Sequence, residues 1–401
     1  MERIIIIGAG HAGVQLADSL REQQFAGAID LIDDEGTLPY QRPPLSKDLV
    51  SCDAVLPLRA PEFYVRQAIT VHSMTAVAVD TAARTVTLSN GKLLDYTKLV
   101  FATGARNRDL PCPGAELDAV YPLRTLADAK AVREKLKNAQ RAVVIGAGFI
   151  GMEFAAVAAA QGIGVSVLST GPRPLNRALS STTADWLAAE HRAHGVDVHN
   201  EEGVARIENV AGALQVHSTR GRILDADLVL YGIGVLPNTE LAAGAGLRIQ
   251  DGIVVDATLQ TSHAGVYALG DCANYPSTTG RCRLESVQNA TDQARTLART
   301  LTDIPTEYGQ VPWFWSTQNK IKVQIAGLGA PQDTQLVLGE PSTGKFSLAL
   351  LREGLLVAVE SVNRPADHQA ARKLLASGMP ITAEMLECNT LKELLTLAPA
   401  R

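Results

Sequence analysis

The chain has 401 residues, of which 46% are hydrophobic, 20% charged and 4% aromatic, and its formal net charge is −5. This length is enough for two or three domains, and the composition is typical of a globular enzyme. The chain has no run of Lys and Arg, and its charge is negative, which argues against a nucleic-acid-binding protein.

The cysteines are odd in number and far apart in the sequence: Cys52, Cys112, Cys272, Cys282 and Cys388. Such spacing argues against a secreted disulfide framework and against a zinc or iron–sulfur site, which would need ligands close together. The apolar run IIII at 4–7 is too short for a signal peptide or a membrane span. We therefore expect a cytoplasmic protein with no metal site and no membrane partner.

The first chemical motif follows that apolar run, which is typical of a strand buried in a parallel sheet. The sequence GAGHAG occupies 8–13 and precedes apolar residues at helical spacing. In this setting Gly8 permits a tight turn, Gly10 lets a pyrophosphate approach the backbone, and Gly13 allows the helix to pack closely on the sheet. The pattern predicts a dinucleotide-binding βαβ unit.

Three acids support this interpretation. AIDLI at 28–32 predicts the second strand, and Asp33, Asp34 and Glu35 follow it. A carboxylate at the end of this strand can accept hydrogen bonds from adenosine ribose hydroxyls. The simpler interpretation, a solvated turn of acidic residues, still fits two of the three.

A second copy of the motif starts 138 residues after the first. GAGFIG occupies 146–151 between an apolar run and a helical pattern, and VSVLS at 165–169 predicts the following strand. Ser169 and Thr170 stand where the ribose acid is expected, so a 2′-phosphate is not repelled there, and Arg173 or Arg177 could bind it. Those arginines could equally cap a loop or reach a pyrophosphate, and the donor could be NADH or NADPH.

Later segments add a cofactor signal and a third domain. GVYALGDCAN at 265–274 predicts a strand that ends at Gly270 and Asp271, where an Asp can bind flavin ribityl hydroxyls. From about residue 309 the pattern changes to alternating strands such as KVQIAGL and FSLALL. We predict an α/β protein with two Rossmann-type, glutathione-reductase-like domains and a C-terminal α+β domain. The predicted limits are 1–108 with 238–308 for a discontinuous FAD-binding domain, 109–237 for an NAD(P)-binding domain, and 309–401 for the last domain.

These motifs together resemble those of the FAD-dependent ferredoxin reductases of bacterial oxygenase systems, the group that contains putidaredoxin reductase and palustrisredoxin reductase. The matching segments run almost from end to end: PYQRPPLSK, FATGAR, YPLRTLADA, VVIGAGFIGMEFAA, GIGVLPN, ALGDCA, LESVQNATDQAR, PWFWS and ESVNRPADH. PYQRPPLSK and ESVQNATDQAR, in this order, are far more specific than a glycine motif.

The resemblance implies the site residues. For FAD they are Gly8, Gly10, His11, Ala12, Gly13, Asp34, Arg42, Pro43, Lys47, Ala102, Thr103, Gly104, Arg124, Gly270, Asp271, Glu285, Ser286, Val287 and Trp315, with Pro44 beside them. For NAD(P) they are Gly146, Gly148, Phe149, Ile150, Gly151, Ser169, Arg177, Gly232, Ile233 and Gly234. The resemblance also implies that Lys47 pairs with Glu153 near flavin N5, as the catalytic pair. From the residues alone, Lys47 would be a surface lysine and Glu153 an acid in the first turn of a helix, favoured there by the helix dipole.

Two departures from the family pattern concern charge. Ser169 replaces the acid that usually selects NADH, and Thr317 follows Ser316 where relatives commonly carry Asp. Lys320 and Lys322 could add basic charge for an acidic ferredoxin, although a solvated strand face is the simpler interpretation.

The predicted activity is electron transfer from NAD(P)H through FAD to a [2Fe–2S] ferredoxin, which serves a cytochrome P450 or a Rieske oxygenase. A flavin suits this task because it takes up two electrons and can release them singly. Two alternatives stay open. One is a peroxidase or disulfide reductase that uses Cys52, and the other is a flavin-bound signalling protein similar to apoptosis-inducing factor.

Overall fold

The computed structural model describes residues 2–48, 56–277 and 280–397. The chain forms two compact units, each assembled from separate segments. Unit 1 contains residues 1–41, 54–106 and 235–310, and unit 2 contains 42–53, 107–234 and 311–401. The limits predicted for the three domains remain a prediction.

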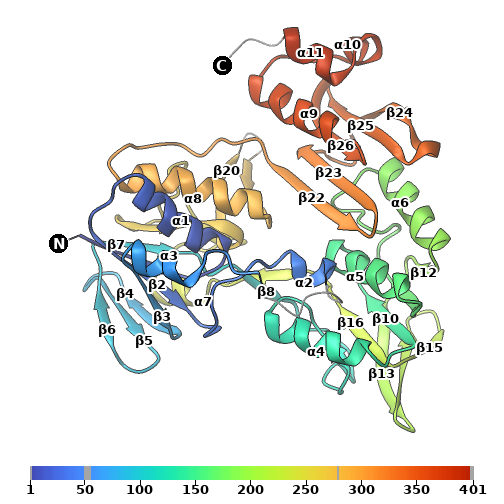
Figure 1. Ribbon diagram of the computed structural model, residues 1–401, viewed down its shortest axis with the longest axis horizontal. Helices are drawn as coiled ribbons and strands as arrows, with labels where there is room; N and C mark the ends of the chain where they lie inside the picture. The colour runs from blue at the N-terminus through green and yellow to red at the C-terminus, as the bar shows by residue number, and fades with distance from the viewer. Residues whose placement is uncertain (1, 49–55, 278–279, 398–401) are drawn as a thin grey trace. The chain divides into compact units, whose positions relative to one another are not determined.

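Unit 1 is built on a five-stranded parallel sheet in the order β19-β7-β1-β2-β3. Its strands are β1 (Arg3–Ile7), β2 (Ala28–Asp33), β3 (Ile69–Ser73), β7 (Lys98–Phe101) and β19 (Val266–Ala268). The isoleucines of β1 are almost completely buried, as expected for a central strand covered on both faces. Helices α1 (His11–Glu22) and α8 (Val287–Leu301) lie side by side in Figure 1 and pack against each other.

Smaller elements complete unit 1. The helices are α3 (Pro61–Arg66), α7 (Glu240–Gly244) and the 3₁₀ turn η1 (Gly270–Cys272). The strands are β4 (Ala76–Asp80), β5 (Thr85–Leu88) and β6 (Leu93–Asp95) in one antiparallel sheet, β18 (Ile253–Val254), β20 (Ala273–Ser277) and β21 (Gly280–Cys282) in a mixed sheet, and β8 (Ala105–Asn107) with β17 (Val235–Pro237).

Unit 2 repeats the same sheet design. Its parallel sheet has the order β12-β11-β10-β16-β9. Here β10 takes the place of β1, and the next two strands in sequence follow it on one side in both sheets. The strands are β9 (Val120–Tyr121), β10 (Arg141–Ile145), β11 (Gly164–Leu168), β12 (Val196–His199) and β16 (Leu228–Tyr231). The helices are α2 (Pro44–Lys47), α4 (Leu126–Leu136), α5 (Phe149–Ala160) and α6 (Ser181–Ala193), and the antiparallel strands are β13 (Val204–Val210), β14 (Ala213–Ser218) and β15 (Ile223–Ala226).

The C-terminal part of unit 2 is an antiparallel sheet in the order β22-β23-β26-β25-β24 with helices beside it. Its elements are β22 (Trp313–Gln318), β23 (Ile321–Gly327), β24 (Thr334–Glu340), η2 (Pro341–Thr343), β25 (Lys345–Arg352), β26 (Leu355–Val362), α9 (Pro365–Ser377), α10 (Ala383–Cys388) and α11 (Leu391–Leu397). Val323 of β23 belongs to the same apolar core as Val144 and Phe154 of the parallel sheet and its helix. The predicted fold class, two Rossmann-type folds with a C-terminal α+β part, is therefore confirmed.

No helix among the described residues has both the length and the apolar character needed to cross a membrane.

Candidate functional site

The two glycine motifs form nearly identical turns. Gly8 has φ +113°, and a Cβ added there would lie 2.2 Å from the carbonyl oxygen of Ala102. Gly146 has φ +104°, and its Cβ would lie 2.4 Å from the carbonyl oxygen of Gly232. Only glycine fits both the backbone angle and the approach of the neighbouring strand end. Each turn thus brings together two segments that were predicted to share a cofactor site.

The middle glycine of each motif borders open space. A Cβ on Gly10 would meet nothing within 4 Å, and one on Gly148 would come no closer than 4.0 Å to the carbonyl oxygen of Gly232. Each of these glycines precedes the first turn of a helix, α1 or α5, whose first amides have no partner within the helix. The open backbone and the positive helix end are what a pyrophosphate requires, so both turns fit a dinucleotide.

Other predicted FAD residues of unit 1 meet at the first turn. Gly270 has φ +76°, and a Cβ on it would lie 3.0 Å from Cβ of Ala12. The amide of Gly270 donates to Oε1 of Gln293 at 2.7 Å, and Gln293 is fully buried on α8. Gln293, inside the segment ATDQAR, was not among the predicted site residues. Its side-chain oxygen holds the backbone amide of Gly270 in place.

The segment at Thr103 and Gly104 is held by Asn238. The Thr103 hydroxyl donates to the Asn238 carbonyl oxygen at 2.6 Å, and Nδ2 of Asn238 donates to the Thr103 carbonyl oxygen at 2.8 Å. The amide of Asn238 donates to the carbonyl oxygen of Gly104 at 2.9 Å. Asn238 was also missed, although it ends the quoted motif GIGVLPN.

The acids after β2 differ in their surroundings. Asp33 is buried and Glu35 accepts a hydrogen bond from the Tyr40 hydroxyl at 2.5 Å. Asp34 is exposed just beyond the strand. Its position leaves the carboxylate accessible to a ribose, as the resemblance implies.

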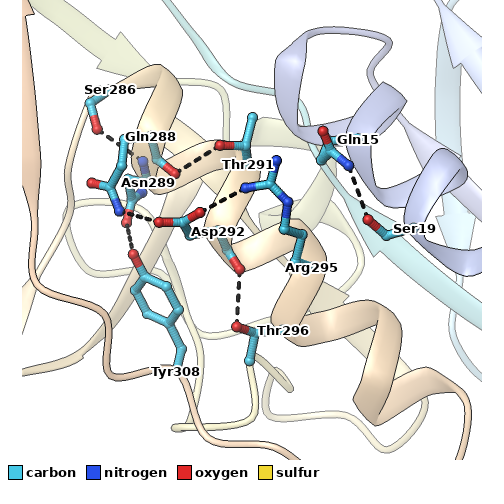
Figure 2. Close-up of polar contacts among 10 residues, drawn as sticks. All are labelled: Gln15, Ser19, Ser286, Gln288, Asn289, Thr291, Asp292, Arg295, Thr296 and Tyr308. Carbon is cyan, nitrogen blue, oxygen red and sulfur yellow. Dashed lines mark hydrogen bonds and ion pairs between the residues drawn. The ribbon is translucent and has the colours of Figure 1, made fainter. Parts of the chain in front are cut away.

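Side-chain hydrogen bonds order the first turns of α8, beginning at the predicted FAD residue Ser286 (Figure 2). Ser286 is the N-cap of α8 and accepts from the amide of Asn289 at 3.0 Å, while Oδ1 of Asn289 accepts from the Tyr308 hydroxyl at 3.1 Å. Asp292 accepts from Gln288 at 2.6 Å and from Arg295 at 2.9 Å one turn along the helix. The start of the helix at Val287 is thereby fixed.

Glu285 and Asp271 both contact Arg283, which the sequence analysis did not single out. The guanidinium lies 2.7 Å from Oε1 of Glu285 and donates to the carbonyl oxygen of Asp271 at 3.1 Å. Hydrogen bonding to Glu285 and the charges of Glu285 and Asp251 raise the pKa of Arg283 in spite of its burial. Arg283 thus ties these two predicted site residues together.

The remaining predicted FAD residues, Arg42, Pro43, Lys47, Arg124 and Trp315, belong to unit 2. Arg42 donates to the carbonyl oxygen of Arg124 at 3.0 Å, so these two are neighbours. Trp315 is half-buried on β22, with its ring 5.4 Å from that of Trp313.

The predicted catalytic pair is formed. Nζ of Lys47 lies 2.9 Å from Oε1 of Glu153, and the side chains are 18% and 3% exposed. The hydroxyls of Ser46 and Ser316 donate to the same carboxylate at 2.5 Å and 2.6 Å. The simpler interpretation of both residues was wrong, because Glu153 lies beyond the first turn of α5 and is buried, and Lys47 is its counter-ion.

The predicted NAD(P) residues surround the second turn. A Cβ on Gly234 would lie 3.8 Å from a terminal nitrogen of Arg177, which is otherwise exposed. Arg173 forms an ion pair with Asp185 at 2.7 Å. The Phe149 ring stacks on Phe314 at 4.5 Å, a contact that the sequence did not reveal.

Ser169 is buried, and its hydroxyl accepts from the amide of Gly171 at 3.3 Å. Its carbonyl oxygen accepts from the amide of Glu202 at 2.8 Å, which places an acidic residue next to it. The Glu202 carboxylate is buried and bound by the Ser218 hydroxyl and Arg222, which together lower its pKa. Lys320 is exposed at the turn between β22 and β23, and Lys322 is exposed at the start of β23.

Comparisons with known proteins agree with this geometry. Residues 2–294 match the model of the pyridine nucleotide-disulphide oxidoreductase family, and residues 313–395 match the reductase C-terminal family. Rhodocoxin reductase of Rhodococcus erythropolis is 46% identical over 95% of this chain and 91% of its own length. The solved ferredoxin reductase for the CYP199A2 system of Rhodopseudomonas palustris is 42% identical, with a TM-score of 0.94 and coverage of 96% of both chains.

The chain belongs to the FAD-dependent ferredoxin reductase family. The structure of the covalent putidaredoxin reductase–putidaredoxin complex also matches, with a TM-score of 0.95, 36% identity and coverage of 100% of this chain and 99% of that one. The predictions of the family, of an FAD-dependent oxidoreductase and of NADH or NADPH as its donor are therefore confirmed. The roles of individual residues of this ferredoxin reductase remain predictions.

Proposed function

We propose that the chain transfers electrons from NADH or NADPH, through FAD, to a [2Fe–2S] ferredoxin that serves a cytochrome P450 or a Rieske oxygenase in the cytoplasm. The main support is the pair of matching glycine turns, one in each unit, together with the buried Lys47–Glu153 pair. Similarity over nearly the whole chain to ferredoxin reductases of oxygenase systems points the same way.

The proposed cofactor sites follow from the two turns. The turn at Gly8–Gly13 would hold the FAD pyrophosphate, Asp34 the adenosine ribose, and Asp271 with the start of α8 the rest of the cofactor. The turn at Gly146–Gly151 would hold the nicotinamide dinucleotide. Bound FAD accepts two electrons from the nicotinamide and releases them singly, which a one-electron iron–sulfur acceptor requires.

Lys47 supplies the positive charge of the site. An ammonium group near the reacting ring favours the gain of negative charge there, and a low-dielectric surrounding strengthens this effect. Glu153 keeps the ammonium in one position, because it is nearly inaccessible to water and binds Lys47 at 2.9 Å.

Three of the four described cysteines do not favour a thiol mechanism. Burial raises the pKa of Cys272, Cys282 and Cys112, whereas a reactive thiol needs a lowered pKa. Cys52, the residue that the peroxidase alternative requires, lies outside the described residues. That alternative predicts that Cys52→Ser abolishes turnover, whereas our proposal predicts unchanged ferredoxin reduction.

Single-turnover stopped-flow absorbance tests the proposal. Mixing the FAD-loaded protein with NADH or NADPH should bleach the flavin band, and an oxidised [2Fe–2S] ferredoxin should restore it at a catalytic rate. No bleaching with either nucleotide would refute the proposal. Bleaching followed by only slow recovery with every ferredoxin tried would favour the signalling alternative.

A further inference from the structure

A buried chain of polar side chains extends from Glu153 into the C-terminal sheet and on to α6. Gln318 donates from Nε2 to Oγ of Ser316 at 3.2 Å, and Oε1 of Gln318 lies 2.6 Å from Nε2 of His191. Ser316 and Gln318 are each 1% exposed, and His191 is 4% exposed. Buried polar groups that join three elements in this way need a partner for every donor and acceptor.

The direction of the hydrogen bonds in this chain follows from the carboxylate at its end. An ionised Glu153 only accepts, so the Ser316 hydroxyl must donate to it, and the oxygen of Ser316 is then left to accept. This requires the amide nitrogen of Gln318 to face Ser316 and its oxygen to face His191. His191 must therefore carry a proton on Nε2. Burial lowers the pKa of His191, so at neutral pH its ring is neutral and carries its one proton on Nε2.

Every donor in the chain points towards Glu153. Polarisation along such a chain strengthens each bond, and the sum stabilises the negative charge at the end. Ser46 adds one more donor from the residue next to Lys47, at 2.5 Å. The carboxylate is thus held in one orientation, with Oε1 shared by Lys47 and Ser316.

We propose that Ser316, Gln318 and His191 form a positioning chain that holds the Glu153 carboxylate in place, and that thereby fixes the Lys47 ammonium for reduction of the flavin by NAD(P)H. This inference rests on the proposed function, because it assigns these residues a role through the catalytic pair. None of the three needs to touch a cofactor. They act through Glu153.

The position of α6 supports such a role for His191. The N-cap of α6, Ser180, donates from its amide and hydroxyl to the buried Glu360 of β26, both at 2.7 Å. Trp186, in the middle of the helix, donates to the carbonyl oxygen of Pro341 at 3.0 Å. The helix is therefore anchored at its N-terminus and at its middle, which limits the movement of His191 one to two turns further on.

Gln318→Glu tests the chain with almost no change of shape. A carboxylate at 318 cannot donate to Ser316, so the Ser316 hydroxyl turns away from Glu153, and a second negative charge is added. Gln332→Glu adds the same charge on an exposed turn of the same C-terminal part, away from the hydrogen-bonded residues, and serves as the control. Loss of one hydrogen bond to a charged group should slow flavin reduction at saturating NAD(P)H about tenfold. The dissociation constant of the nucleotide should stay nearly constant.

The flavin midpoint potential gives a readout independent of activity. It should become more negative in Gln318→Glu than in Gln332→Glu, because the added carboxylate and the less ordered Lys47 both oppose the gain of electrons. Because the carboxylate added by Gln318→Glu lowers the potential by its charge alone, variants at His191 that add no charge separate that effect from the role of the chain.

A pair of variants at His191 decides the question if Gln318→Glu does not fold. His191→Gln keeps a donor at the position of Nε2 and should retain the wild-type rate of flavin reduction and the wild-type midpoint potential. His191→Leu removes the donor and should show a slower reduction and a more negative potential. Equal rates and potentials in Gln318→Glu and Gln332→Glu, or in the two His191 variants, would overturn the inference. If the wild type itself is not reduced by either nucleotide, the proposed function fails instead.

Discussion

Removing the ammonium group of Lys47 should destabilise unit 2 before any effect on catalysis is considered. Lys47→Met leaves the Glu153 carboxylate, which is 3% exposed, with two serine donors and no cation. Breaking a buried ion pair on one side costs about 3–5 kcal/mol, and the 18% exposure of Lys47 argues for the lower end, about 3 kcal/mol. A unit of this size should then melt roughly 6–12 °C lower.

The double variant Lys47→Met/Glu153→Gln is the matched control. A neutral amide removes the unpaired charge, and the hydroxyls of Ser46 and Ser316 can turn to donate to its oxygen or accept from its nitrogen. We expect the double variant to recover most of the lost stability, but none of the lost rate of flavin reduction. Thermal unfolding followed by far-UV circular dichroism, without added nucleotide, measures the first effect, and stopped-flow reduction measures the second.

Two results would refute this reasoning. A melting temperature of Lys47→Met within about 1 °C of the wild type would show that the pair carries little stability. A double variant that is less stable than Lys47→Met would show that the charge of Glu153 is not the cause of the loss.

Three further predictions concern the glycine turns, the nucleotide donor and acid stability. Gly148→Ala should leave the protein folded and yellow but weaken NAD(P)H binding, measured by titration of absorbance changes, whereas Gly10→Ala should leave the protein folded but colourless. Both added methyl groups enter open space beside the start of a helix, so unfolding of either variant would contradict this prediction. Ser169→Asp should lower the kcat/KM for NADPH relative to that for NADH, because a carboxylate repels a 2′-phosphate, and an unchanged ratio would mean that the phosphate binds elsewhere. Burial lowers the pKa of His368 to about 4, below its unfolded value. The free energy of unfolding should therefore fall between about pH 6.5 and pH 4, by up to about 1.4 kcal/mol per pH unit, because only the unfolded chain binds a proton at this residue in that range. His368→Leu should make the free energy of unfolding less dependent on pH between those values.

The sequence predicted best those parts of the molecule whose structure is determined by residues close together in the chain. The strand, glycine turn and helix at 4–20 and at 142–160 are each specified by residues a few positions apart. Apolar periodicity predicts the strand and the helix, and the turn between them has a backbone conformation that favours glycine. The repeat of this pattern was enough to predict two sheets of the same design. Both sheets follow that design in their strand order.

The side chains that the sequence analysis missed act over long separations. Asn238 reaches Thr103 across 135 positions, and His191 reaches Gln318 across 127. Amide and imidazole groups carry no periodic signal, and each of these residues alone has the appearance of an ordinary polar residue. Their partners become apparent only when the fold brings distant segments together.

The acid that is missing after β11 shows how the two kinds of information combine. The sequence places Ser169 where a ribose-binding carboxylate is expected, which by itself favours neither nucleotide. The structure adds Glu202, whose amide donates to the carbonyl oxygen of Ser169. The Glu202 carboxylate is buried, accepts a hydrogen bond from the Ser218 hydroxyl and forms an ion pair with Arg222. The charge of this acid is already balanced by Arg222. We therefore expect that Glu202 does not restore the repulsion of a 2′-phosphate, and that the selection between NADH and NADPH depends on Ser169 and the exposed Arg177.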